Sequence, residues 1–156
     1  MCAVVYILKP PHILGNGGKM TEKEKYIRQA FARYRKNKKQ IAEMRFEQSN
    51  SASPPATKSR KNSNGYENAL IGYIDKKLKL EKACEIVERT LYHYEVYERA
   101  NGDGKAQYIR CRFLQGMSFA LAGVECELAE STACFWLEDI RTTATAIAET
   151  YNLWGT

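Results

Sequence analysis

The spacing of apolar residues predicts helices along most of this chain. Between Thr21 and Gln48, apolar side chains return at helical intervals, although cations interrupt them. The segment opens with T-E-K-E at Thr21–Glu24, a capping-box pattern in which the threonine and the second glutamate satisfy each other's backbone N–H groups. The apolar positions are Ile27, Phe31, Tyr34, Ile41 and Met44. We therefore expect one basic helix over residues 20–48.

A longer helix is expected over residues 66–100. Its apolar residues recur every three or four positions and no proline interrupts them. They include Leu70, Tyr73, Ile74, Leu80, Cys84, Val87, Leu91 and Tyr94. A helix of about 34 residues is about 50 Å long, more than a small domain requires. Its length predicts either self-association, as a homodimer, or docking of the N-terminal helix onto it.

Three further helices are expected in the C-terminal region, residues 101–156. N-G-D-G at Asn101–Gly104 ends the long helix, and a helix over residues 105–115 follows. The next two share a 3-1-3 apolar spacing, with Leu128 between them: Phe119, Ala122, Gly123 and Cys126, then Ala133, Trp136, Leu137 and Ile140. Ser131 and Thr132 are candidate caps of the last helix. Two amphipathic helices joined by a tight turn predict a helix-turn-helix.

The predicted fold class is therefore all-α, with long helices and a C-terminal three-helix helix-turn-helix unit. We expect Phe113, Phe119, Leu128, Trp136 and Ile140 to form its small core. Residues 142–151 either extend the last helix or follow a bend after Arg141. Ser, Asn and Pro dominate residues 49–65, which indicates a flexible linker. Residues 1–19 are interpreted as a disordered tail or as a non-native leader before a start at Met20.

The positive charge is concentrated in the first part of the chain. Residues 1–61 contain 14 Lys and Arg against 4 Asp and Glu, whereas residues 62–156 contain 10 against 14. Such asymmetry is typical of a segment that binds nucleic acid. The cations that we expect to contact phosphates are Arg33, Arg35, Lys36, Lys38 and Lys39. The alternative is a solvated basic face on a docking helix.

Composition argues against several other functions. The five cysteines form no C-x-x-C pair, so reduced core thiols are expected and no metal or other cofactor is predicted. We predict no enzyme, since the chain lacks a phosphate-binding loop and a Ser/His/Asp arrangement. The longest apolar run, Ala3–Leu8, is too short for a membrane span. We expect a cytoplasmic protein without membrane contact.

Residues 116–141 resemble a known helix-turn-helix. They read G-M-S-F-A-L-A-G-V-E-C-E-L-A-E-S-T-A-C-F-W-L-E-D-I-R, similar to the fourth region of bacterial sigma factors and to phage late transcription regulators of the ArpU and RinA type. The matching positions are Gly116, Ser118, Leu128, Thr132, Trp136 and Leu137. The chain departs from the pattern at Gly123, at Cys126, at Glu127, where the family has its turn glycine, and at Ala129, where it has the capping serine.

The resemblance implies a regulator, in particular an activator of phage late genes, that binds double-stranded promoter DNA alongside the host RNA polymerase and is associated with the nucleoid. The positions at the exposed start of the last helix that are expected to meet base edges are Glu130, Ser131, Cys134 and Phe135, and the hydroxyls of Ser131 and Thr132 are candidate donors to phosphates. Arg110, Arg112 and Arg141 are expected to hold the DNA backbone.

Two other functions are compatible with the same sequence. Small terminase subunits, which package DNA, also join a helix-turn-helix to long oligomerising helices. Alternatively, the acidic last helix, with Glu130, Glu138 and Asp139, docks on a basic protein partner. The first alternative predicts a closed ring of subunits, and the second predicts that the chain does not bind DNA even at low salt.

Overall fold

The computed structural model describes residues 19–50, 63–101 and 104–155, and all regular structure in these ranges is helical, which confirms the all-α class. The helices are α2 (Glu22–Ala32), α3 (Tyr34–Asn50), α4 (Ser63–Asn101), α5 (Lys105–Ile109), the π-helical turn η2 (Arg110–Leu114), α6 (Phe119–Glu125) and α7 (Glu130–Tyr151). Of the predicted tail and linker, residues 1–18 and 51–62 lie outside the described ranges.

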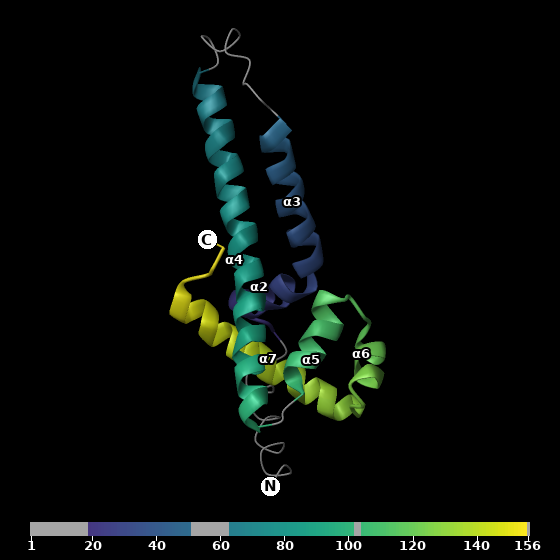
Figure 1. Cartoon of the computed structure of the whole chain (residues 1–156). Helices are drawn as coiled ribbons and strands as arrows, with labels where there is room; N and C mark the ends of the chain where they lie inside the picture. Colours follow the sequence, from purple (N-terminus) through teal and green to yellow (C-terminus); the bar gives the residue numbers. More distant parts are fainter. Residues whose placement is uncertain (1–18, 51–62, 102–103, 156) are drawn as a thin grey trace.

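The long helix α4 is the axis of the molecule (Figure 1). Helix α3 runs antiparallel to its first half, and the two form a hairpin that projects from the rest of the protein. Helices α2, α5 and α7 pack against its second half, with α6 at the side. The N-terminal helices therefore dock on α4, which is one of the two outcomes that its length predicted.

The predicted helix over residues 20–48 is in fact two helices that meet at Arg33. Its start is as expected, because Thr21 and Glu24 form the complete capping box. After Arg33 the direction changes, and Tyr34 begins α3. The break has a packing reason: α2 buries Ile27 and Phe31 against α4 and α7, whereas α3 follows α4 outward, and one straight helix cannot do both.

One hydrophobic core joins the two ends of the chain. Its fully buried residues come from α2, α4, α5 and α7: Ile27, Ile86, Val87, Tyr108, Ile109 and Ile140. Phe31 packs edge-on against Phe113, with ring centroids 4.9 Å apart. Among the residues expected to form a small C-terminal core, Ile140 is central, but Phe113, Phe119, Leu128 and Trp136 are only partly buried. The C-terminal helices therefore share their core with α2 and α4.

A short turn joins α6 to α7, and α7 includes residues 142–151, which the sequence placed either in the same helix or after a bend. Ser118 caps α6, and Glu127 takes a left-handed conformation, with φ of 56°, in the turn. The helix α7 then runs without a bend to Tyr151. The expectation that Ser131 or Thr132 caps it is wrong: the N-cap is Ala129, which makes no side-chain bond, so both hydroxyl residues lie in the first turn.

Two glycines give a matched test of this backbone. Gly116 has φ of +76°, and a Cβ there would overlap the Arg35 side chain. Gly72 lies inside α4, and a Cβ there would meet nothing within 4 Å. We expect Gly116→Ala to lower the free energy of unfolding by about 1–2 kcal/mol, since alanine tolerates positive φ poorly. Gly72→Ala should raise it by about 0.5–1 kcal/mol. Urea denaturation measures both, and equal signs would contradict the described turn.

Candidate nucleic-acid interface

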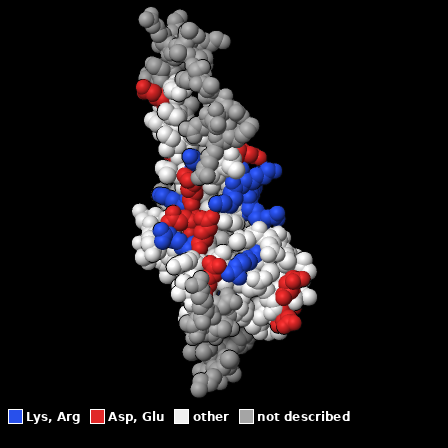
Figure 2. Space-filling model, viewed as in Figure 1, with Lys and Arg blue, Asp and Glu red and all other residues white. Residues whose placement is uncertain are grey.

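The cations of α3 form an exposed basic face. Arg35, Lys36 and Lys39 lie on the side of α3 opposite its buried residues, and all three are exposed. Figure 2 shows basic side chains gathered over this helix. Arg33, at the break, is exposed as well. All five predicted N-terminal cations are thus exposed, and Arg35, Lys36 and Lys39 lie within little more than one helical turn.

Lys38, the fifth, is engaged in holding α3 to α4. Its Nζ lies 3.1 Å from an oxygen of Glu88, and the Tyr34 hydroxyl donates to the same carboxylate at 2.8 Å. Burial, together with this hydrogen bond, raises the pKa of Tyr34. Because its charge is already matched, Lys38 is a weaker candidate for phosphate contact than its neighbours on the basic face.

Arg35 connects the basic face to the C-terminal helices. Its side chain lies over Gly116, in the loop that leads into α6, so closely that a Cβ there would displace the arginine side chain. The first turn of α3 therefore lies next to the loop that precedes the α6–α7 corner. The basic face and the C-terminal helices thus belong to one packed body.

The three C-terminal arginines differ in their surroundings. Arg110 donates to Glu95 at 2.7 Å, and Arg112 donates to the carbonyl of Met117 at 3.0 Å. Burial lowers the pKa of Arg141, and the charges of Arg28 and Arg112 lower it further. Arg110 and Arg112 are thus used largely within the fold, whereas Arg141 is partly buried near the cations of Arg28 and Arg112, whose effect the Glu138 carboxylate opposes. Arg28 was not among the predicted site residues.

The start of α7 is accessible but acidic. Glu130, Ser131, Thr132 and Cys134 are exposed, whereas Phe135 is partly buried. Exposed carboxylates surround this tip, and Figure 2 shows acidic side chains over α6, separate from the basic face of α3. The exposed acidic residues from the end of α6 to the start of α7 are Glu125, Glu127 and Glu130. Two exposed apolar residues of α6, Leu121 and Val124, adjoin them. Leu121 and Val124 were not among the predicted site residues, and only their outward positions on the helix could have indicated this apolar and acidic surface in the sequence.

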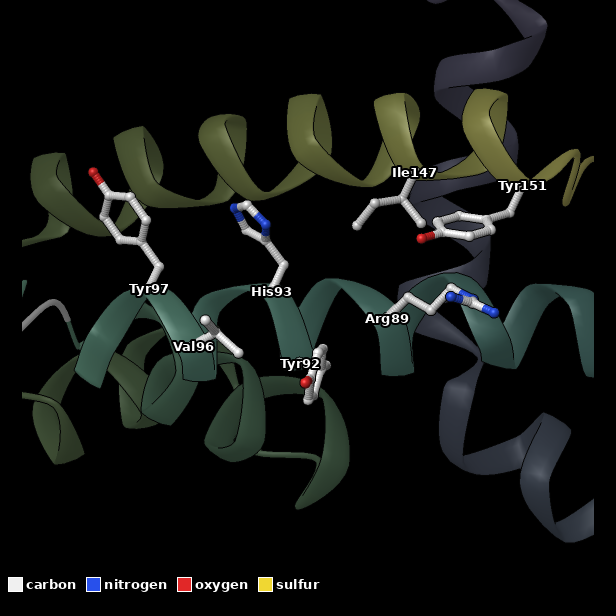
Figure 3. A pocket seen from close by; sticks show the side chains of 7 residues that line it. All are labelled: Arg89, Tyr92, His93, Val96, Tyr97, Ile147 and Tyr151. Carbon is white, nitrogen blue, oxygen red and sulfur yellow. The ribbon is translucent and has the colours of Figure 1, made fainter. Parts of the chain in front are cut away.

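Two hollows lie beside α4 in the described part of the chain. A cavity of about 450 Å³ between α4 and α7 is lined by Arg89, Tyr92, His93, Val96, Tyr97, Ile147 and Tyr151 (Figure 3). A smaller one, of about 310 Å³, lies between α3 and α4 and includes Cys84. Burial raises the pKa of that thiol to about 11, so it stays protonated near neutral pH. Within the described ranges, no group of three or more His, Cys, Asp or Glu could hold a metal.

Comparison with known proteins identifies no relative of this chain. No protein-family model, curated protein or solved structure matches the chain. In the described part of the chain, no helix combines the length and apolar character needed to cross a membrane.

Proposed function

We propose that this protein binds double-stranded DNA and acts as a transcriptional regulator of the phage late type. The observation that carries the proposal is the exposed basic face of α3, formed by Arg35, Lys36 and Lys39. Three neighbouring cations repel one another, and a phosphate backbone relieves that repulsion while releasing condensed counterions. Arg28 and Arg141 extend the positive potential toward the C-terminal helices.

The start of α7 supplies the groups that distinguish sequences. Ser131 and Thr132 donate to phosphates, and the Glu130 carboxylate accepts from cytosine N4. The exposed part of the Phe135 ring contacts a thymine methyl. The neighbouring carboxylates of Glu125 and Glu127 oppose close approach to phosphates, so base contacts at this tip add preference rather than affinity.

Selection and salt titration test the proposal together. We expect the full chain to bind random duplex DNA at about 50 mM salt with an affinity that falls steeply by about 200 mM, as expected for several phosphate contacts. Sequences selected from a random pool should share a motif. Phe135→Ala should alter that motif while leaving the salt dependence unchanged. Absence of binding at low salt would contradict the proposal.

A second candidate function rests on the α6–α7 corner. Leu121 is 49% exposed and Val124 is 72% exposed, and both lie next to the exposed carboxylates of Glu125, Glu127 and Glu130. Apolar side chains rimmed by charge are typical of protein-binding surfaces. On this reading the corner docks on a basic protein, which is compatible with regulation of a polymerase. If the full chain does not bind DNA at low salt, protein binding through the α6–α7 corner becomes the preferred function.

A further inference from the structure

One face of α4 carries large apolar residues that no described helix covers. Ile71 is 64% exposed and Tyr92 is 67% exposed. Ile74, Leu78 and Val96 are exposed as well, and all five fall on one side of the helix at about 100° per residue. The buried residues of α4, such as Ile86 and Val87, point toward the core instead. This free face extends over about 38 Å, the rise of the residues from Ile71 to Val96.

The free face is apolar at both ends and charged in the middle. Lys82, Glu85 and Arg89 continue the same side of the helix between Leu78 and Tyr92. Glu85 and Arg89 are joined within the chain by a 2.6 Å ion pair. Figure 2 shows charged side chains of both signs gathered over the middle of α4. The distribution is nearly symmetric about the midpoint of the face, which falls between Ala83 and Cys84.

We propose that the free face of α4 binds the same face of a second copy of this chain, in antiparallel orientation. A two-fold axis through the midpoint of the face sets the register of the two subunits. The facing residues are Ile71 with Val96 of the partner subunit, Leu78 with Arg89 of the partner subunit, and Lys82 with Glu85 of the partner subunit. Each apolar end thereby meets an apolar end, and opposite charges meet at the centre.

Orientation is decided by the central charges. In a parallel pair, Lys82 would lie beside its own copy and Glu85 beside its own, and like charges in close contact are unfavourable. In the antiparallel pair, Lys82 of each subunit faces Glu85 of the other, so the favourable contact forms twice, once on each side of the axis. An isologous contact of this kind closes after two subunits, so it predicts a dimer and no larger ring.

The cavity between α4 and α7 fits the proposed partner. Figure 3 shows Tyr92 and Val96 on α4, with Ile147 and Tyr151 reaching down from α7. Because Ile71 of the partner subunit faces Val96, its side chain comes to the edge of this cavity, which has room for about 450 Å³. Tyrosine and arginine are enriched where binding energy is concentrated, and Arg89 already lies over the Tyr151 ring at 3.8 Å.

Sedimentation equilibrium of the full chain tests the dimer. A single strip of this size is at the small end of specific interfaces, so we expect a dissociation constant in the micromolar range. Ile71→Glu should weaken the dimer by at least about tenfold, since it places a charge in the apolar end. The matched control, Val124→Glu, changes an equally exposed residue on α6 and should leave the dimer intact. A wild-type monomer at about 100 µM, or an unaffected Ile71→Glu dimer, would overturn the proposal.

A charge exchange tests the central contact. Lys82→Glu and Glu85→Lys should each weaken the dimer by about tenfold, and the double variant should recover most of the loss, because opposite charges face each other again. Loss of the Glu85–Arg89 pair persists in the double variant, so recovery reports the contact between subunits. A double variant as weak as the weaker single variant would refute the pairing.

Cross-linking tests the orientation. In a Cys2→Ser, Cys134→Ser background, a mixture of Ile71→Cys and Val96→Cys chains should form a disulfide-linked dimer. Neither variant alone should do so, since residue 71 of one copy lies far from residue 71 of the other in an antiparallel pair. Cross-linking of Ile71→Cys with itself would indicate a parallel arrangement and refute the proposal. Each of these outcomes is independent of DNA binding.

Discussion

Phe31→Ala is expected to lower the free energy of unfolding by about 3–5 kcal/mol, the usual loss for a large aromatic residue removed from a core. Phe31 is only 4% exposed and packs edge-on against Phe113. Because α2 and the C-terminal helices share this core, the loss should appear in the whole transition. Urea denaturation followed by circular dichroism and by tryptophan fluorescence measures it, and the two signals should coincide.

Two further substitutions calibrate this result. Phe31→Leu keeps most of the buried volume and should cost no more than about 1.5 kcal/mol. Val124→Ala changes a residue that is 72% exposed, so its effect should stay within about 0.5 kcal/mol. If Phe31→Ala destabilised the N-terminal helices while the fluorescence transition of Trp136 and Trp154 remained in place, the shared core would be wrong.

Replacing Arg35, Lys36 and Lys39 together by glutamine should lower the affinity for random duplex DNA about 100-fold at low salt. Each cation that neutralises a phosphate contributes about 0.9 to the slope of log affinity against log salt, so the slope should fall by about 3. The three residues are exposed, so the fold should remain stable. Fluorescence anisotropy at several salt concentrations measures affinity and slope together.

A second triple variant controls for net charge. Lys23, Lys25 and Lys79 are each ion-paired with a carboxylate, those of Glu149, Glu22 and Asp75. Their replacement by glutamine removes the same total charge but should change DNA affinity by less than about threefold. Equal losses in the two triple variants would mean that net charge alone attracts DNA, and the basic face of α3 would lose its assigned role.

The structure also explains why substitution is preferable to deletion. Removing residues 21–61 would eliminate the basic face, but it would also remove Ile27 and Phe31 from the core. A loss of DNA binding by such a truncated chain would then report unfolding as much as lost phosphate contacts. Charge neutralisation separates the two effects because all three altered residues are exposed and only Arg35 also contacts another segment, at Gly116.

Elements with strong local signals could be predicted from the sequence. The long uninterrupted apolar period of α4 and the capping box of Thr21 and Glu24 both appear in the structure. The break at Arg33 could not be predicted, because an interrupted apolar stripe is compatible with one helix or two. The start of α7 was misassigned for a related reason: Ser131 is a better capping residue than Ala129, but tertiary packing fixes where the turn ends.

The candidate site was predictable only where exposure follows from the helical period. The outward positions of Arg35, Lys36 and Lys39 follow from the buried stripe of α3. The engagement of Arg110 with Glu95 could not be foreseen, because it depends on how α5 folds back against α4. The approach of Arg35 to Gly116 likewise joins segments far apart in the sequence, which no local pattern reports.

The shared core also determines when the protein can fold during synthesis. The Tyr26 hydroxyl donates to the carbonyl of Leu153, and Lys23 pairs with Glu149, so contacts that secure α2 span nearly the whole chain. Because α7 is synthesised long after α2, the apolar faces of α2 and α4 stay uncovered until α7 has emerged from the ribosome. We expect the nascent chain to be more prone to aggregation and proteolysis until α7 is in place.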